Sequence, residues 1–494
     1  MASELIDRFA RVRRDTPDKV LVHNLTDQRT QTSAQLWDEF EAVRGALIGA
    51  GLVDENLLVA MTGNRGSSVT LLMACLDLRI PIMPVDRGTA LPEVLDLVDR
   101  WSASALVLAE PPPAFSHPPH VVLPLPNDLY LVRFPDMRPH PEQYIGAALL
   151  KLTSGSSGQP KATRTTERHL CEDVDHIVEA MEIRPEDMQL GAIPLSHAYG
   201  LGNLVLPLLT QGTAIAIRDG FAPKQFEADV HRLGISVFPG VPFMFEHLLP
   251  FVPPERWPKS LGLLISAGAR LELRTQHAFK EQFNVKIHSF YGASETGGIC
   301  YDDSEEISTV LTVGRMMPGV TVKLLKGDIG SPPNGGRVHV TSSAVADGYA
   351  GLPDSRQEGF IHGGFLTGDL GYFVGHRDLR HLVLTGRVSE FINVAGRKVH
   401  PVEVERALRQ MPEVADVRVM GAPCPKRGQI IVACIVPRSS ALTPGIVRQY
   451  CVLRLAAYKI PREFLFLERF PQDERGKTNR RALEEAIAVH LSDR

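Results

Sequence analysis

Short apolar runs alternate with helix-like segments along the first 290 residues, and this alternation constrains the fold more than any other feature. The strand-like runs lie at residues 57–61, 81–85, 105–109, 192–193, 214–217, 237–238, 263–266 and 286–290. The helix-like segments lie at residues 33–51, 67–78, 91–98, 166–181, 224–233 and 271–282. Short buried strands that alternate with helices form parallel sheets covered on both faces. Two such arrays in succession therefore predict two doubly wound α/β lobes.

The pattern changes after about residue 307, where short β-type runs such as 320–325 and 337–341 are broken by Gly and Pro. This pattern of short, interrupted strands predicts a small β-barrel. The last hundred residues predict a compact α+β unit, with helices at 401–410, 444–456 and 480–490 and strands at 417–420 and 430–436. A chain of 494 residues is too long for one core. We predict a large N-terminal domain of residues 1–386, a hinge at 387–390 and a small C-terminal domain of residues 391–494.

The composition is that of an ordinary globular protein, with 44% hydrophobic and 22% charged residues. Lys and Arg number 53 against 57 Asp and Glu, so no basic surplus indicates nucleic acid or anionic lipid as a partner. No apolar run approaches the roughly 18 residues of a membrane span, and the N-terminus lacks the apolar core of a signal peptide. The six cysteines are scattered, with no pair at metal-binding spacing. We expect a cytoplasmic protein without a membrane span.

A glycine- and hydroxyl-rich stretch separates the two predicted arrays, and it reads Lys151-Leu-Thr-Ser-Gly-Ser-Ser-Gly-Gln-Pro-Lys-Ala162. Such a loop between a strand and a helix can hold a phosphate, because glycines expose backbone N–H groups, hydroxyls donate, and a helix start is electropositive. The common nucleotide loop is excluded, since Pro160 replaces its second glycine and Ala162 its Ser or Thr. The alternative is a flexible linker.

Four later stretches carry polar groups that suit a nucleotide. Residues 290–298 place Tyr291, Ser294 and Glu295 at the end of a strand, where an aromatic ring can stack on adenine, a hydroxyl can bond phosphate and a carboxylate can hold Mg2+. Asp369, between glycines, can accept bonds from both ribose hydroxyls. The other two stretches are residues 384–405 and the Gly-Lys turn of residues 471–483. Taken alone, residues 290–298, Asp369 and residues 471–483 could each be an ordinary turn.

Taken together and in this order, the five stretches resemble the adenylate-forming superfamily, which contains acyl- and aryl-CoA synthetases, the adenylation domains of nonribosomal peptide synthetases and luciferases. The resemblance covers essentially the whole chain. It implies that ATP is bound by Thr153, Ser154, Gly155, Ser156, Ser157, Gly158, Lys161, Gly268, Ala269, Tyr291, Gly292, Ser294, Asp369, Arg387 and Lys477.

The resemblance also assigns the chemistry. The catalytic residues would be Lys477, Glu295, Ser294 and Thr153, with Glu295 as the Mg2+ ligand. The C-terminal domain would be mobile and would carry the catalytic lysine. Ser389 falls at the hinge, where the family usually has Asp or Lys, and Gly396 would line the tunnel of the thiol substrate.

Two further segments resemble the walls of the family's carboxylic acid pocket, residues 194–201 and 265–270. The implied substrate residues are His197, Tyr199, Gly200, Phe238, Val241, Phe243, Ser266 and Gly292. Amino-acid-activating relatives carry an Asp here for the substrate's ammonium, and residues 197–203 contain no acid. We therefore expect an acid without an α-amino group, and both aliphatic and aryl acids stay open.

The implied reaction has two steps. The acid attacks the α-phosphorus of ATP and releases pyrophosphate, and a thiol then takes the acyl group from the adenylate. The cofactors would be ATP, Mg2+ and coenzyme A, or the phosphopantetheine of an acyl carrier protein. We keep two alternatives to an acid–CoA ligase: an adenylating ligase that loads a carrier protein, and a non-catalytic nucleotide-binding relative.

Overall fold

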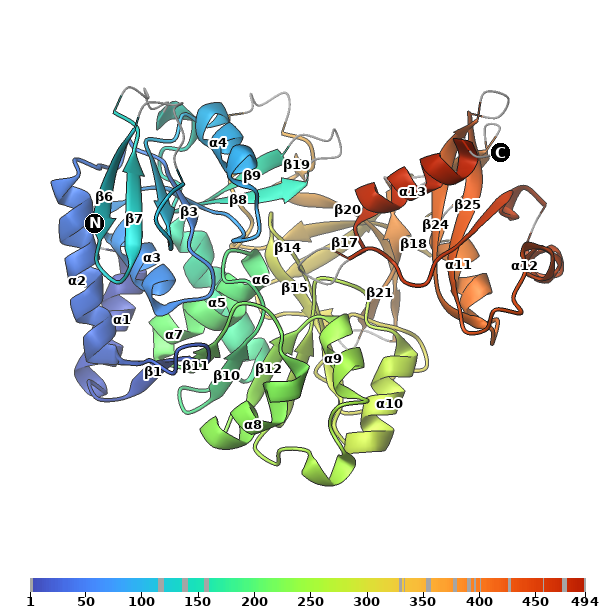
Figure 1. Cartoon of the computed structure of the whole chain (residues 1–494), viewed down its shortest axis with the longest axis horizontal. Coiled ribbons are helices and arrows are strands. Elements are labelled where there is room, and N and C mark those ends of the chain that lie inside the picture. Colours follow the sequence, from blue (N-terminus) through green and yellow to red (C-terminus); the bar gives the residue numbers. More distant parts are fainter. Residues whose placement is uncertain are drawn as a thin grey trace. The chain divides into compact units, whose positions relative to one another are not determined.

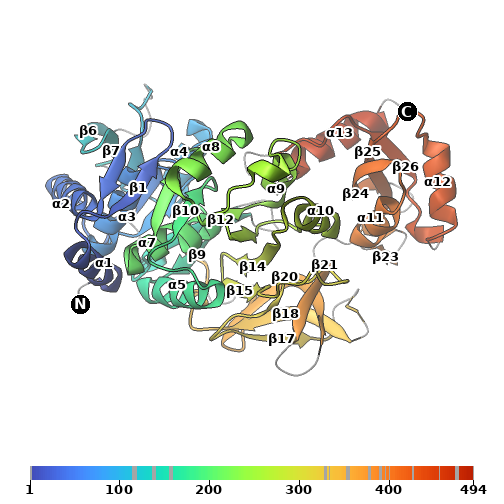
Figure 2. The same ribbon diagram turned by 90° about the horizontal axis from the view of Figure 1, so that it is seen from below.

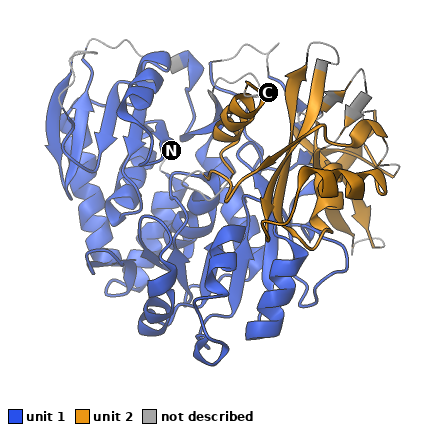
Figure 3. Cartoon of the chain, turned by 45° about the vertical axis from the view of Figure 1, so that its right-hand side comes forward, with its two compact units in different colours: residues 1–322, 340–365 blue, residues 323–339, 366–494 orange. Residues whose placement is uncertain are grey.

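The chain forms two compact units, one of residues 1–322 and 340–365 and the other of residues 323–339 and 366–494 (Figure 3). The structure is a computed structural model that describes residues 3–113, 120–135, 141–154, 160–327, 331–332, 334–351, 357–375, 380–388, 392–394, 397–399, 401–424, 428–455, 457–472 and 478–492. The predicted hinge at 387–390 and the domains on either side of it stay predictions.

The first unit contains a seven-stranded sheet whose central strands are parallel (Figure 1). Its strands, in spatial order, are β6 (Val121–Leu125), β7 (Leu129–Arg133), β5 (Ala105–Leu108), β3 (Leu58–Met61), β4 (Ile82–Pro84), β8 (Leu149–Ser154) and β9 (Pro160–Thr165). The three strands predicted between residues 57 and 109 are confirmed. The apolar runs did not predict the β6–β7 hairpin. Asn127 and Asp128 lie in its turn with φ of 63° and 58°. A tight hairpin turn requires such positive φ values.

A nine-stranded sheet forms the other half of the same unit, and it is again parallel in its middle. Its strands, in spatial order, are β16 (Arg315–Met316), β15 (Gly297–Tyr301), β14 (Ile287–Ala293), β13 (Leu263–Ser266), β12 (Val237–Gly240), β10 (Met188–Gly191), β11 (Ala214–Ile217), β1 (Val20–Asn24) and β2 (Thr30–Thr32). The predicted strand at 192–193 is wrong. Ala192 and Ile193 are buried, but they follow the last paired residue of β10.

Helices pack against these sheets (Figures 1 and 2). They are α1 (Glu4–Asp15), α2 (Ser33–Gly49), α3 (Gly66–Leu78), α4 (Leu91–Arg100), α5 (Glu167–Met181), α6 (Ala198–Gly200), α7 (Leu206–Gln211), α8 (Pro223–Leu233), α9 (Pro242–Leu248) and α10 (Leu273–Phe283). Thr32 and Gln35 form a capping box that begins α2.

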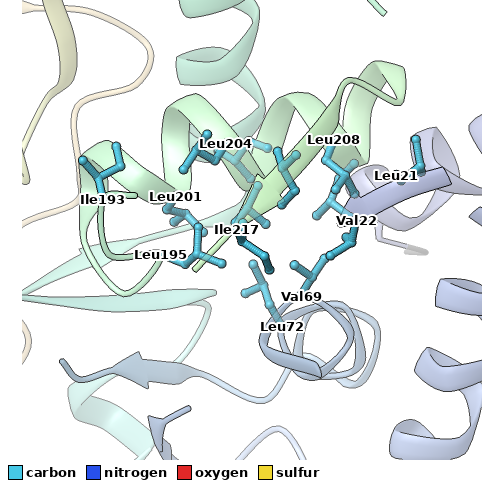
Figure 4. Close-up of a cluster of buried hydrophobic side chains, with 14 of the residues drawn as sticks. Leu21, Val22, Val69, Leu72, Ile193, Leu195, Leu201, Leu204, Leu208 and Ile217 are labelled. Carbon is cyan, nitrogen blue, oxygen red and sulfur yellow. The ribbon is translucent and has the colours of Figure 1, made fainter. Parts of the chain in front are cut away.

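The main core joins the two halves of this unit (Figure 4). Val69 and Leu72 of α3 face Ile217 of β11, and the side chains of Leu201 and Leu204 close the same cluster. Burial of such side chains contributes about 25 cal/mol per Å² of apolar surface. The two α/β halves of this unit therefore share one hydrophobic core.

The region predicted as a small barrel forms a five-stranded sheet. Its strands are β17 (Thr321–Leu325), β18 (Gly335–Thr341), β20 (Gly364–Val374), β19 (Phe360–Ile361) and β21 (His381–Arg387). The C-terminal α+β segment contains β22 (Ile392–Val394), β23 (Arg397–Val399), α11 (Pro401–Arg409), β24 (Val414–Cys424), β25 (Gly428–Pro437), α12 (Pro444–Val452), β26 (Glu463–Phe466) and α13 (Arg480–Ser492). Among the described residues, no helix combines the length and apolar character that a membrane crossing requires.

Candidate active site

The predicted phosphate loop joins strands β8 and β9 of a β-hairpin. The two strands are antiparallel, and Thr153 lies opposite Lys161. The glycines and serines between them, Gly155, Ser156, Ser157 and Gly158, lie outside the described residues. The structure describes only the backbone of Ser154, which is the last residue of β8.

This hairpin corrects the sequence interpretation in one respect. We expected the loop to run directly into a helix whose electropositive start faces the phosphate. Strand β9 intervenes, and α5 begins only at Glu167. The carboxylate of Glu167 there accepts bonds from the Ser3 hydroxyl at 2.6 Å and the Leu5 N–H at 2.8 Å. The side chain of Glu167 is therefore bound to the start of α1.

Glu295 lies in the turn between β14 and β15, together with Ser294. Its Oε1 accepts a hydrogen bond of 2.8 Å from the hydroxyl of Tyr349, and its carbonyl accepts one of 2.9 Å from the N–H of Ala346. The ammonium of Lys161 lies 5.0 Å from the centre of the Tyr349 ring and 3.2 Å from Glu358 Oε2. Tyr349 thus connects the predicted metal ligand with the lysine of the predicted phosphate hairpin.

Strand β14 brings Tyr291 and Gly292 to the same turn, at a register shift against β15. Tyr291 is buried, and Gly292 is exposed. A Cβ on Gly292 would lie 2.7 Å from the carbonyl oxygen of Gly297. Only glycine therefore fits there without a backbone shift.

Two buried charged residues that the motifs did not reveal attract each other across β8 and α5. Lys151 of β8 is 8% exposed and Asp173 of α5 is 7% exposed. Burial lowers the pKa of Lys151 and raises the pKa of Asp173, while the attraction of each for the other acts in the opposite direction, and Glu295 also attracts Lys151. Asp173 Oδ1 accepts a bond of 2.8 Å from the N–H of Gly298. This pair supports the turn that carries Glu295.

In the second unit, the predicted ribose ligand Asp369 lies opposite Arg387 in the β20–β21 ladder. Their side chains form an ion pair, with Arg387 Nε 3.1 Å from Asp369 Oδ1. The Asp369 side chain is 16% exposed and that of Arg387 is 54% exposed. The structure thus brings together these two residues from separate sequence motifs.

The predicted acid-pocket residues gather around the ends of β12 and β13. The hydroxyl of Tyr199 donates to the carbonyl of Ile265 at 3.1 Å, and its ring lies 5.8 Å from that of Phe290. The hydroxyl of Ser266 is buried and has no hydrogen-bond partner among the residues that the structure describes. A buried hydroxyl without a partner is costly, so this group can receive a polar atom of a ligand.

The other predicted pocket residues and the predicted adenine turn differ in how deeply they are buried. Phe238 and Val241 are buried, and Phe243 is half-buried. At Gly200, a Cβ would lie 2.1 Å from the Pro194 carbonyl oxygen. The turn residues Gly268 and Ala269 are exposed, and Gly268 has a φ of +78°.

His197 has a partner that the sequence did not suggest. Its Nε2 lies 3.1 Å from Oδ2 of Asp86, which follows β4 in the other half of the unit. No acid occurs in residues 197–203, so only the fold could place this carboxylate beside the histidine. Tyr349 was missed for the same reason, because it lies 54 positions from Glu295.

Three further predicted residues, Ser389, Gly396 and Lys477, lie outside the described residues. The roles assigned to all the site residues stay predictions. Within the described part of the chain, no group of three or more His, Cys, Asp or Glu side chains could hold a metal ion.

Comparisons with known proteins agree with the fold. The ATP-bound MatB from Rhodopseudomonas palustris superimposes with a TM-score of 0.82 at 20% identity, covering 98% of this chain and 99% of that one. The sulfoacetate–CoA ligase of Cupriavidus necator is 31% identical over 348 residues, which are 69% of this chain and 67% of that protein. The fatty acid–[acyl-carrier-protein] ligase ScoC of Streptomyces coeruleorubidus is 26% identical over 486 residues, or 93% of this chain and 92% of that one.

The fold and these motifs define an ATP-dependent, AMP-forming ligase. The AMP-binding enzyme family matches residues 9–350 and its C-terminal domain matches residues 403–477, so the chain belongs to this family. The predicted fold class and the predicted resemblance to the adenylate-forming superfamily are confirmed.

Proposed function

We propose that this protein activates a carboxylic acid with ATP and transfers the acyl group to coenzyme A. The observation that carries this proposal is the AMP-binding family match in both parts of the chain, at residues 9–350 and 403–477. The similarity to sulfoacetate–CoA ligase supports coenzyme A as the acceptor. The acid itself stays open.

The reaction would proceed in two steps. An oxygen of the acid attacks the α-phosphorus of ATP, the bond to the β-phosphate breaks, and pyrophosphate leaves. No general base is needed, because a carboxylic acid is already ionised at neutral pH. The thiolate of the acceptor then attacks the acyl carbon, and AMP leaves with the oxygen that it gained from the acid.

The site residues serve the first step by placing positive charge and donors where negative charge develops. We assign Lys161, Thr153 and the hairpin turn to the phosphates of ATP, and Asp369 with Arg387 to its ribose. Lys477 would reach the α-phosphate in this step. The second step would follow rotation of the domain of residues 391–494 about Ser389, which brings Gly396 to the thiol tunnel.

Mg2+ suits the chemistry of this site. The ion is commonly bound by one or two carboxylates together with the phosphates of the substrate. Glu295, whose carboxylate already accepts one neutral hydrogen bond from Tyr349, offers such a single carboxylate. A bound Mg2+ would neutralise negative charge on the phosphates.

The substrate would be an acid without an α-amino group. Asp86, the carboxylate beside His197 of the predicted pocket segment, is occupied by His197 and by the N–H of Gly88 at 3.1 Å. A substrate ammonium would have to compete with both partners. The unpartnered hydroxyl of Ser266 and the ring of Tyr199 would contact the acid instead.

A second candidate keeps the adenylation but uses an acyl carrier protein as acceptor. The similarity to the carrier-protein ligase ScoC over 93% of this chain favours it. Both acceptors present the same phosphopantetheine thiol, so the chemistry of the second step is common to them. The cytoplasmic location expected from the sequence stays a prediction.

Pyrophosphate release with ATP, Mg2+ and a panel of acids, with and without coenzyme A, tests the proposal. We expect continuous turnover only when a suitable acid and coenzyme A are both present, with one AMP for each thioester. A single stoichiometric burst that coenzyme A does not extend would favour the carrier protein. Formation of ADP and orthophosphate would contradict the proposal.

A further inference from the structure

Tyr349 connects three parts of the first unit that the sequence places far apart. Its hydroxyl donates to Glu295 Oε1 at 2.8 Å, in the turn after β14. Its ring receives the ammonium of Lys161, on strand β9, at 5.0 Å. Both partners belong to the proposed ATP site, whereas Tyr349 belongs to none of the motifs.

The backbone around Tyr349 is fixed on both sides. Gly348 accepts a bond of 2.8 Å from the N–H of Arg164, and Ala350 donates one of 2.8 Å to the carbonyl of Ala162, so this segment lies along β9. The side chain of Gln357 bonds both the N–H of Tyr349, at 2.6 Å, and its carbonyl, at 2.9 Å. The ring packs edge-on against Phe360, with 5.2 Å between centroids.

The hydroxyl of Tyr349 lies 2.8 Å from Glu295 Oε1, and an ionised carboxylate has no hydrogen to donate. The phenol is therefore the donor and the carboxylate is the acceptor. A donor held this firmly fixes one oxygen of Glu295 and leaves the other oxygen to a ligand.

We propose that Tyr349 is a positioning residue that orients the carboxylate of Glu295 toward Mg2+·ATP and keeps it at a fixed spacing from Lys161. This inference rests on the proposed function, because that proposal assigns Glu295 and Lys161 to ATP. Partners of metal-binding carboxylates typically change metal affinity or activity about 10- to 100-fold when they are removed.

The test is Tyr349→Phe, which deletes the hydroxyl and retains the ring that contacts Lys161 and Phe360. We expect the apparent Mg2+ dissociation constant of the protein–ATP complex, measured by calorimetric titration with Mg2+, to rise about 10-fold. The matched control is Tyr144→Phe, since Tyr144 is also buried and its hydroxyl bonds the Glu55 carbonyl at 3.2 Å, away from the site. The control should leave the Mg2+ constant unchanged.

A double variant separates positioning from a general structural role. If Tyr349 acts through Glu295, then Tyr349→Phe should have no further effect on the Mg2+ constant in a Glu295→Gln background. Equal effects in both backgrounds would overturn the proposal. A Mg2+ constant of Tyr349→Phe equal to that of the wild type would overturn it as well.

The titration does not depend on finding the acid substrate. If the wild type binds Mg2+·ATP but no acid supports pyrophosphate release, the proposed ligase activity is contradicted. The comparison of the Mg2+ constants of Tyr349→Phe and wild type still decides the role of Tyr349. If the wild-type ATP complex shows no Mg2+ dependence at all, the positioning role is contradicted.

Discussion

At the scale of single residues, the two carboxylates that we assign to ATP lie in different surroundings. Glu295 accepts from a neutral phenol, whereas Asp369 faces the guanidinium of Arg387 at 3.1 Å. A neutral partner leaves the charge of Glu295 available for a cation. The charged partner holds Asp369 in one orientation, which suits an acceptor for two ribose hydroxyls.

Asp369→Ala should raise the apparent KM for ATP about 10-fold, because it removes the acceptor for the ribose hydroxyls and leaves Arg387 without this partner. The ATP dependence of pyrophosphate release measures the effect. Glu484→Ala is the control, since it breaks an exposed ion pair of 3.1 Å with Arg480 on α13. An unchanged KM for Asp369→Ala would refute the ribose assignment.

His288 provides a prediction on pH. Burial lowers its pKa, and its Nδ1 lies 2.8 Å from the carbonyl of Asp302. The folded state therefore prefers the neutral ring, while the unfolded chain takes up a proton as the pH falls below about 6.5. Stability should decrease from that pH downward, and the lowered pKa values of His23 and His169 act in the same direction.

His288→Gln should reduce this acid-induced loss. Urea unfolding at pH 7.5 and pH 5.5 gives the difference in unfolding free energy for each protein. We expect the difference to be smaller in the variant by about 1 kcal/mol, because the variant has no ring to protonate at this position. An equal pH dependence of wild type and variant would show that His288 does not contribute.

At the scale of elements, the β14–β15 turn depends on its contact with α5. Gly297 has a φ of +69°, and a Cβ there would lie 2.2 Å from Asp173 Oδ1. The same carboxylate bonds the N–H of Gly298. The absence of a side chain at Gly297 thus lets α5 approach the turn that carries Glu295.

Gly297→Ala should therefore destabilise the protein by more than the backbone conformation alone requires. Gly234→Ala is the matched control, because Gly234 has a φ of +63° and no atom within 4 Å of its Cβ position. We expect the control to lose about 1–2 kcal/mol of unfolding free energy and Gly297→Ala to lose at least about 2 kcal/mol more. Equal losses in urea unfolding would show that the contact with Asp173 relaxes at no cost.

The sequence predicted elements better than it predicted their connections. The apolar runs gave most of the parallel strands, since burial on both faces produces a continuous apolar signal. The run at 192–193 failed because burial does not require strand pairing. The β8–β9 hairpin was missed because the polar stretch 160–165 carries no apolar run, although its backbone pairs fully with β8.

At the scale of the whole molecule, the order of the motifs carried more information than any single motif. It predicted the superfamily, whereas the alternation of strand-like and helix-like segments predicted the fold class. The contacts of Asp86 with His197 and of Tyr349 with Glu295 could not be predicted in this way. Each contact joins two residues that do not share a motif and that only the folded chain brings together.

The two-step mechanism predicts that Lys477 acts in one step only. Lys477→Ala should reduce adenylate formation about 10²–10³-fold or more, because it removes a cation from the developing charge on the α-phosphate. It should spare thioester formation from a synthetic acyl-adenylate. Rates of both half-reactions, measured separately, test this. Equal losses in the two steps would argue against the alternation of domains about Ser389.

The central claim is that an oxygen of the acid attacks the α-phosphorus of ATP. The most direct measurement is mass spectrometry of AMP formed during turnover with an acid whose carboxylate carries 18O. The account predicts that each AMP gains one 18O from the acid, because cleavage of the acyl-adenylate leaves that oxygen on the phosphate. AMP without label, or label that appears in orthophosphate, would contradict it.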